Sequence, residues 1–218
     1  MLSFWRGIRE GGVLAWQNLL QLVLLNLILL LLGWTVVLLG PALLAVYEYI
    51  ARTFRDEEKH RLEELPAWVR SHLLNGVLYL LGWILLLGLL YTNLVFWAQV
   101  LPAFGQAILM VLVGYILVFA LALQPYLLER LTVHRLPYLK ALPAALQDLI
   151  REPIASHFHT LVPITLLLIS LKWMTLPLIV FTSVGLMFAA ARVKAAHQMP
   201  EPQEEHLNDN EDPSHAGL

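Results

Sequence analysis

Three long runs without a single charged side chain constrain this chain more than any other feature. They cover residues 13–39, 73–101 and 107–128; a charged stretch at 48–70 separates the first from the second, and a turn that begins at Pro102 separates the second from the third. Apolar stretches of about 20 residues or more are typical of bilayer-crossing helices, which satisfy their backbone polar groups within the segment. With 59% hydrophobic and 14% charged residues, the 218-residue chain departs from soluble proteins in the same direction. We therefore expect an all-α, polytopic transmembrane helical bundle.

Composition also excludes some kinds of chemistry and of partner. The chain has no cysteine, which rules out disulfides, thiolate nucleophiles and cysteine metal sites. Six of its 16 acidic residues lie between 201 and 212, so the rest of the chain is mildly basic. Such a balance is expected beside an anionic cytoplasmic leaflet. The expected partner is therefore the lipid bilayer, and no nucleic acid is implied.

The order of the segments predicts a single transmembrane domain over 13–197. An interfacial segment at 1–12 precedes it, and a disordered acidic tail at 198–218 follows, because the tail is too polar to bury a core. Two amphipathic cytoplasmic helices are expected at about 62–71 and 138–151. The expected membrane helices cover about 13–39, 41–54, 73–101, 106–128, 154–171 and 174–194.

The number of crossings depends on residues Gly40, Pro41 and Ala42, which we interpret as a tight turn outside the cytoplasm. If 41–54 then returns across the membrane, the chain makes six crossings with both termini in the cytoplasm, and 13 of the 14 Lys and Arg residues face that side. If 41–54 lies along the interface, there are five crossings and the division is 11 to 3. Both obey the positive-inside rule, and six crossings obey it better. We expect a multi-pass protein of the inner membrane.

Uncharged polar residues inside the apolar runs are the first candidate site. Amides within lipid must pair, so they either hold helices together or line a cavity that accepts a hydroxylated solute such as a sugar. Gln17 and Gln21 lie four residues apart, on one face of a continuous helix, and we favour helix contacts over a cavity. The full set is Gln17, Gln21, Asn26, Asn75, Asn93 and Gln124.

Charged and titratable residues give weaker candidates. Lys172 is the only charged residue between 153 and 192, but beside Trp173 at a hairpin tip it is expected to reach the outer interface. Glu48 and Glu129 lie near basic residues at expected cytoplasmic ends and are interpreted as interfacial charges. We find no motif for a catalytic, metal or cofactor site, and we expect a protein that is not an enzyme.

Two short sequence motifs of the first half of the chain recur, in weaker form, in the second half. Pro41-Ala-Leu-Leu recurs as Pro125-Tyr-Leu-Leu, and Leu65-Pro66-Ala67 recurs as Leu142-Pro143-Ala144. A duplicated unit, as transporters often have, and a chance similarity are both open.

Several short motifs resemble the YesL family of polytopic bacterial membrane proteins, also catalogued as DUF624. They are Asn18-Leu-Leu, Gly40-Pro41-Ala42 followed by Ala45 and Tyr47, Arg70-Ser-His-Leu-Leu-Asn75, and Glu152-Pro153. The chain departs from the family pattern at Leu38, where a Thr is usual, and at Leu65-Pro66-Ala67-Trp68, where a Phe-rich helix is usual.

The resemblance implies a context and supplies no catalytic residues. The family has no established activity, and its members are often encoded near carbohydrate-uptake and carbohydrate-degradation systems. It therefore implies a non-enzymatic accessory or permease-like component, with ABC-transporter membrane or ATPase subunits or a second copy of the chain as partners. An autonomous small-solute transporter with a polar cavity between its helices is the alternative, and a membrane enzyme is a third reading.

Overall fold

The computed structural model describes residues 2–56, 58, 60–151, 153–159, 165 and 176–197, and the regular secondary structure of these residues is entirely helical. The expected all-helical class is therefore confirmed. Among the described residues, three helices are long and apolar enough to cross a membrane, or four spans are possible if a sharply bent pair of helices counts as one. The six crossings, and the alternative of five, stay predictions.

The first apolar run is divided among three helices, since its last residues already belong to α3 (Val36–Tyr49). α1 (Leu2–Gln17) and α2 (Leu19–Gly33) meet at Asn18 with a bend of 86°. The side-chain amide of Asn18 and its backbone N–H both donate to the Leu14 carbonyl, at 2.9 and 3.0 Å. An asparagine that competes for a helix carbonyl in this way favours a helix end. The prediction of one continuous helix over 13–39 is therefore wrong.

The turn predicted at Gly40, Pro41 and Ala42 is wrong as well, because all three residues lie buried inside α3 (Val36–Tyr49). The chain turns earlier, at Trp34 and Thr35. Gly40 contacts Gly76 of α5 at this point: a Cβ built on Gly40 would lie 2.8 Å from the carbonyl carbon of Gly76. The two glycines let the helix backbones touch, and this packing outweighs the tendency of Gly-Pro to end a helix.

α3 continues into the π-helical turn η1 (Ile50–Arg55), so that the pair forms a 20-residue segment. The segment expected at 41–54 is thus helical and begins five residues earlier than expected. A 20-residue helix is about 30 Å long, which matches the hydrocarbon thickness of a bilayer.

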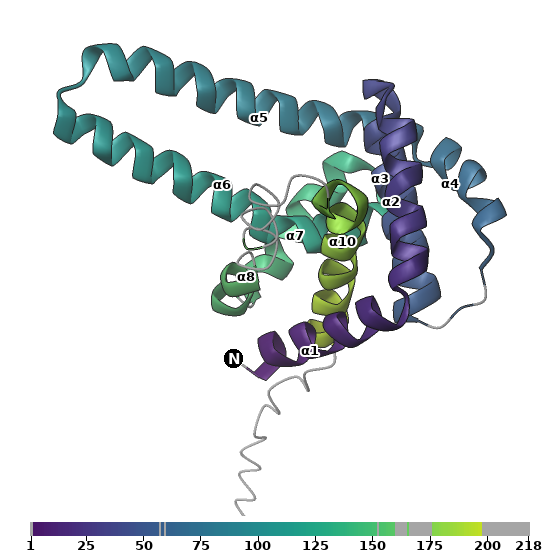
Figure 1. The fold of residues 1–218 in the computed structure, drawn as a ribbon. Coiled ribbons are helices and arrows are strands. Elements are labelled where there is room, and N and C mark those ends of the chain that lie inside the picture. Colours follow the sequence, from purple (N-terminus) through teal and green to yellow (C-terminus); the bar gives the residue numbers. More distant parts are fainter. Residues whose placement is uncertain are drawn as a thin grey trace, which may run out of the picture.

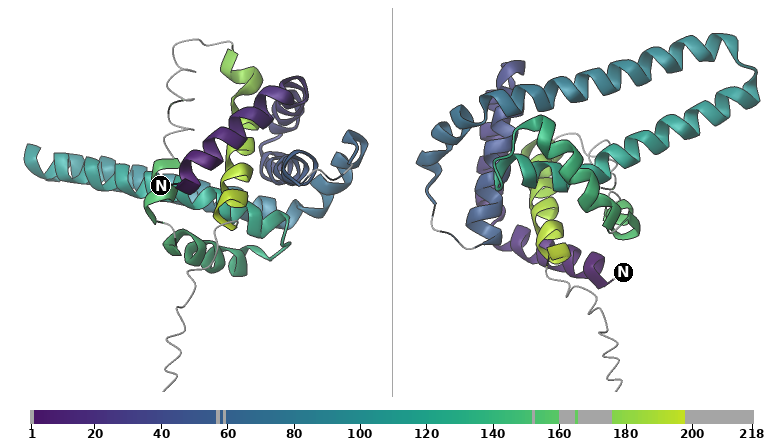
Figure 2. Two further views of the ribbon diagram at one scale, coloured as in Figure 1. Left: turned by 90° about the horizontal axis from the view of Figure 1, so that it is seen from below. Right: turned by 180° about the vertical axis from the view of Figure 1, so that it is seen from behind.

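A long hairpin extends from the helical body. It consists of α5 (Leu73–Val100) and α6 (Ala103–Thr132), which are joined at Leu101 and Pro102. Figures 1 and 2 show its closed end projecting well beyond the other helices, whereas its base lies between α3 and α7. Pro125 lies inside α6 without ending it.

Shorter elements complete the body. η2 (Leu62–Glu64) and α4 (Leu65–Ser71) follow η1, and α7 (Tyr138–Arg151) and α8 (Pro153–His159) follow α6. α10 (Leu176–His197) packs against α1, α2, α6 and η1. Most of the helix expected at 154–171, Lys172, and the tail 198–218 lie outside the described residues.

The buried core lies where α2, α3, α10 and the basal half of α6 meet. It includes Leu22 and Leu25 of α2, Leu44 and Ile50 of the α3 segment, and Leu131 of α6, all fully buried. The outer half of the hairpin takes no part in this core. The body and the hairpin are therefore joined only at the base of the hairpin.

Candidate functional site

The most heavily charged part of the described interior lies at this base, around the carboxylate of Glu48. Glu48 belongs to α3 and is fully buried. Its Oε1 accepts hydrogen bonds from Arg52 Nε at 2.9 Å and from an Arg135 guanidinium nitrogen at 3.1 Å. Its Oε2 lies 2.5 Å from Nε2 of His72, which is buried at the start of α5. One carboxylate therefore ties together α3, the start of α5 and the end of α6.

A second buried carboxylate, Glu129 of α6, forms a parallel network. Its Oε2 accepts a hydrogen bond from the Tyr47 hydroxyl at 3.0 Å and another from the Arg55 guanidinium at 2.7 Å. Arg55 also forms a two-bond pair with the neighbouring Asp56, at 2.8 and 2.7 Å. Lys194 of α10 donates to the backbone carbonyl of Arg55 at 3.0 Å, which brings a fourth helix to the cluster.

Two local distortions of the backbone place the arginines. The π-helical turn at Ile50–Arg55 widens the end of α3, and such turns are frequent at functional sites. At the end of α6, Arg135 has a φ of 51°. The Leu136 N–H donates across this left-handed residue to the Arg130 carbonyl, six residues back, at 2.9 Å. Glycine is usual there, and here the arginine reaches Glu48.

In each network, an acid from one half of the chain pairs with an arginine from the other half. Glu48 of the first half pairs with Arg135 of the second, and Glu129 of the second half pairs with Arg55 of the first. Each arginine follows the acid of its own half after six or seven residues. We refer to Glu48, Arg55, Glu129 and Arg135, with their partners Tyr47, Arg52, Asp56 and His72, as the basal charge cluster.

Asn75 connects the hairpin to α7. Its side-chain amide donates to the Leu136 carbonyl at 3.1 Å, and its Oδ1 accepts the Tyr138 N–H at 3.2 Å. Arg130 at the end of α6 forms a two-bond pair with Asp148 of α7, at 2.8 and 3.0 Å. α7 is thus fixed at both ends against the base of the hairpin.

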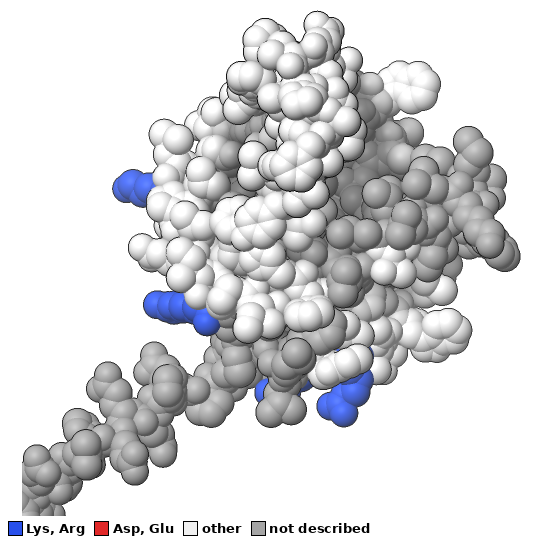
Figure 3. Space-filling model, turned by 90° about the vertical axis from the view of Figure 1, so that its left-hand side faces the viewer, with Lys and Arg blue, Asp and Glu red and all other residues white. Residues whose placement is uncertain are grey.

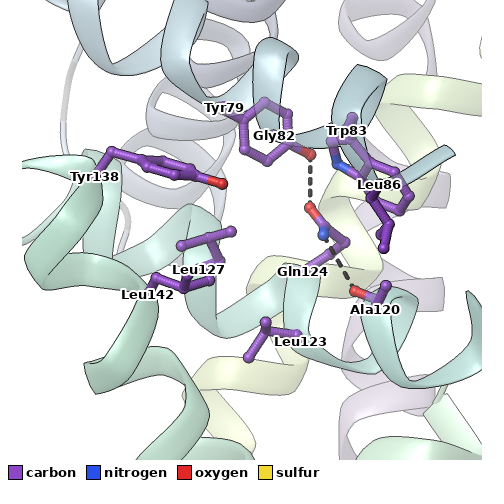
Figure 4. A pocket seen from close by; sticks show the side chains of 10 residues that line it. All are labelled: Tyr79, Gly82, Trp83, Leu86, Ala120, Leu123, Gln124, Leu127, Tyr138 and Leu142. Atoms are coloured by element: carbon purple, nitrogen blue, oxygen red, sulfur yellow. Dashed lines mark hydrogen bonds between the residues drawn. The ribbon is translucent and has the colours of Figure 1, made fainter. Parts of the chain in front are cut away.

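A cavity of about 90 Å³ lies beside the cluster, between α5, α6 and α7. Figure 4 shows Tyr79 and Gln124 facing each other across it: the Tyr79 hydroxyl donates to Gln124 Oε1 at 2.6 Å, and Gln124 Nε2 donates to the Ala120 carbonyl at 3.1 Å. The remaining lining is mostly apolar. It consists of Gly82, Trp83, Leu86, Leu123, Leu127, Tyr138 and Leu142.

The other predicted amides do not meet in one place. Gln17 and Gln21 are both exposed, and the bend at Asn18 separates them, so the prediction that they share a helix face is wrong. Asn26 is buried in α2. The Asn93 side chain donates to the Leu89 carbonyl of its own helix at 2.8 Å. Of the predicted set, Asn75 and Gln124 hold elements together, and Gln124 also lines a cavity.

The interpretation of Glu48 and Glu129 as interfacial charges stays a prediction, but neither is a surface charge of the protein, because only 0% and 5% of their surfaces are exposed. The sequence does contain a signal for their burial. Glu48 follows Tyr47 in an otherwise apolar stretch, and Glu129 ends a charge-free run, positions where an acid is costly unless it is paired. What the sequence does not give is which arginine, 74 or 87 residues away, completes each pair.

A surface cluster outside the membrane segments surrounds His60. Its two ring nitrogens lie 2.8 Å from Glu58 Oε2 and 3.0 Å from Glu64 Oε2. The hydrogen bonds to Glu58 and then to Glu64 raise the pKa of His60, and the contact with His60 lowers the pKa of Glu58. Among the described residues, no group of three or more His, Asp or Glu side chains could hold a metal ion.

Together, the fold and the cluster define an all-helical protein with several helices apolar enough to cross a membrane, whose apolar hairpin is anchored through buried ion pairs. Residues 22–94 match the family described as "Protein of unknown function, DUF624". The match covers Glu48, Arg55 and His72, and over this segment it confirms the resemblance seen in the motifs. No curated protein and no solved structure matches the chain.

Proposed function

We propose that this protein is a non-enzymatic component of the inner membrane that acts through other membrane subunits, as an accessory or permease-like part of carbohydrate uptake. The proposal is supported by the exposed apolar surface of the hairpin formed by α5 and α6. Leu85 and Leu89 of α5 and Val111 of α6 are 71%, 63% and 74% exposed, in helices that contact the body only at their base. Such faces require lipid or the helices of a partner.

The surface at the closed end of the hairpin supports this proposal. Figure 3 looks at that end and shows uncharged surface over most of the visible face. Lys and Arg side chains lie toward its left and lower edges, and no Asp or Glu is visible among the described residues. An uncharged hairpin with basic residues near its base suits a crossing whose base, like both chain termini, faces the cytoplasm.

The interior of the described residues favours an accessory part over a self-contained transporter. A cavity of about 90 Å³ is well below the roughly 300–1,000 Å³ of ordinary ligand pockets. Both buried glutamates of the basal charge cluster are paired with guanidinium groups, which supports a structural role for them over a catalytic one. The carbohydrate context itself rests on the family resemblance.

The two cytoplasmic surface helices are proposed as further docking surfaces. In α7, Ala141, Ala145 and Leu149 pack inward, whereas Leu139 and Ile150 are 80% and 66% exposed. A helix that is apolar on two faces can pack on its own bundle and on a second surface at once. The segment 62–71 is the weaker candidate for a docking surface, because the residues it exposes are mostly small or charged.

Affinity purification of the tagged protein from its native membrane, with mass spectrometry of the co-purifying proteins, tests the proposal. We expect stoichiometric recovery of ABC-transporter membrane or ATPase subunits. Leu85→Trp and Val111→Trp should reduce that recovery, since lipid accommodates a larger side chain and a packed partner does not. Leu31→Trp on α2, where Leu31 is 78% exposed, is the matched control. A protein that purifies alone, or only with copies of itself, would refute the accessory role.

An autonomous small-solute transporter is the alternative, and the exchange of ion pairs between the two halves favours it, because transporters are often built from repeats. It predicts sugar uptake by liposomes that contain this protein alone. Uptake that Glu48→Gln abolishes would favour this alternative over the accessory role.

A further inference from the structure

We propose that the cavity between α5, α6 and α7 binds one acyl chain of a bilayer phospholipid. The proposal concerns a lipid site and does not depend on the proposed role in uptake.

The chemistry of the lining selects an apolar occupant. Its polar side chains at the inner end, Tyr79 and Gln124, are already bonded to each other and to the Ala120 carbonyl. A sugar would need unpaired donors and acceptors, and an ordered water needs two to four polar partners. The other walls are mainly Trp83, Tyr138, leucine side chains and the bare backbone of Gly82, so that the Tyr138 hydroxyl is a further polar group beside an otherwise largely apolar lining.

The size of the cavity fits part of a chain and not a whole molecule. Its volume of about 90 Å³ is about three times the ~30 Å³ that one water occupies in the liquid. Empty space of this size between apolar groups forfeits dispersion contacts on all sides. A flexible chain segment that enters from the side would restore those contacts.

Gly82 keeps this space open. A Cβ built there would meet the hydroxyl of Tyr138 and would lie 3.3 Å from the ring carbon that carries it. Figure 4 shows the Tyr138 ring pointing from α7 toward Gly82 across the cavity. Leu142 lines the same side and is 39% exposed, so the cavity borders the outer surface there.

The depth of the cavity matches that of lipid chains. Gly82 lies nine residues from the start of α5, and Gln124 lies eight residues before the end of α6, which corresponds to about 14 and 12 Å along the helices. If the charged base lies at the membrane surface, the cavity falls within the half-thickness of about 15 Å of a hydrocarbon core. The cavity also adjoins the exposed apolar face of the hairpin, which makes the bilayer its nearest source of ligand.

Photochemical labelling tests the site. The protein is reconstituted with phosphatidylcholine that carries a diazirine in the middle of one acyl chain, irradiated, and mapped by mass spectrometry. We expect adducts concentrated on residues 79–86 and 120–127. Gly82→Leu, and independently Ala120→Leu from the opposite wall, should reduce these adducts severalfold.

Two glycines on the same helices provide matched controls. A Cβ at Gly88 of α5 or at Gly114 of α6 meets nothing within 4 Å, so Gly88→Leu and Gly114→Leu should leave the adducts unchanged. Circular dichroism verifies that each variant is folded, and Ala120→Leu serves if Gly82→Leu is not. Adducts spread evenly along the hairpin, adducts that persist in a folded filled variant, or labelling by a diazirine fatty acid but not by the phospholipid would overturn the proposal.

Discussion

Replacing Glu129 with glutamine tests whether the basal charge cluster holds the hairpin to the body. The substitution keeps the shape of the side chain and still offers an oxygen to the Tyr47 hydroxyl, but it removes the charge that faces Arg55. Both partners of this pair have side chains that are only 7% exposed. Breaking a buried ion pair from one side typically costs about 3–5 kcal/mol, because a charge is left uncompensated.

The neighbouring Asp56 moderates this cost. It keeps two hydrogen bonds to Arg55 at 2.8 and 2.7 Å, so we expect a loss near the lower limit, about 3 kcal/mol in the free energy of unfolding. That is roughly a 150-fold decrease in the folding equilibrium constant. Equilibrium unfolding in mixed detergent and dodecyl sulfate micelles, followed by circular dichroism, measures it.

A double-mutant cycle separates the pair from a general loss of packing. Arg55→Gln combined with Glu129→Gln should be less destabilising than the sum of the two single changes, with a coupling of about 1 kcal/mol or more. Asp148→Asn, which breaks a pair with the 25% exposed Arg130, is the control and should cost about 1 kcal/mol. If Glu129→Gln costs no more than this control and shows no coupling to Arg55, the cluster does not anchor the hairpin.

Three further predictions follow from single contacts. Gly76→Ala should destabilise the protein by about 1–3 kcal/mol, since its Cβ would lie 2.7 Å from the Gly40 carbonyl carbon, whereas Gly88→Ala should be neutral or stabilising; micelle unfolding measures both. Arg135→Gly should be more stable than Arg135→Ala by about 1 kcal/mol, because φ is 51° and both variants lose the same ion pair; equal stabilities would refute this. The contacts of His60 with its two glutamates should be complete below about pH 6.5 and be lost as the pH rises through its raised pKa; the ring shifts in NMR should titrate above those of an unfolded histidine.

The all-helical class and the positions of α5 and α7 could be predicted from the sequence, because long apolar runs and the period of an amphipathic helix are local signals. The break at Asn18 and the continuity of α3 through Gly40 and Pro41 could not. In the first case, one asparagine side chain competes with the backbone for a carbonyl. In the second, a contact with Gly76, 36 residues away, overrides the local preference of Gly-Pro.

The candidate site shows the same division between local and distant information. Asn75 and Gln124 could be identified because an amide in an apolar run requires a partner, but the pattern does not distinguish them from Gln17, which is exposed. The burial of Glu48 and Glu129 could not be predicted for the opposite reason. Nearby arginines in the sequence made them resemble surface charges, and burial depends on how the helices meet.

The arrangement of charges in the cluster suggests why it is retained. A hairpin fixed only at its base acts as a lever, so small changes in the base cause large movements of the closed end. Apolar packing alone would tolerate several rotations of α6 against α3, whereas Glu48 with Arg135 and Glu129 with Arg55 impose two separate distance constraints on the same pair of helices. Two constraints exclude rotations that one would allow, and they supply the orientation that a hairpin needs to present one defined face to lipid or to a partner.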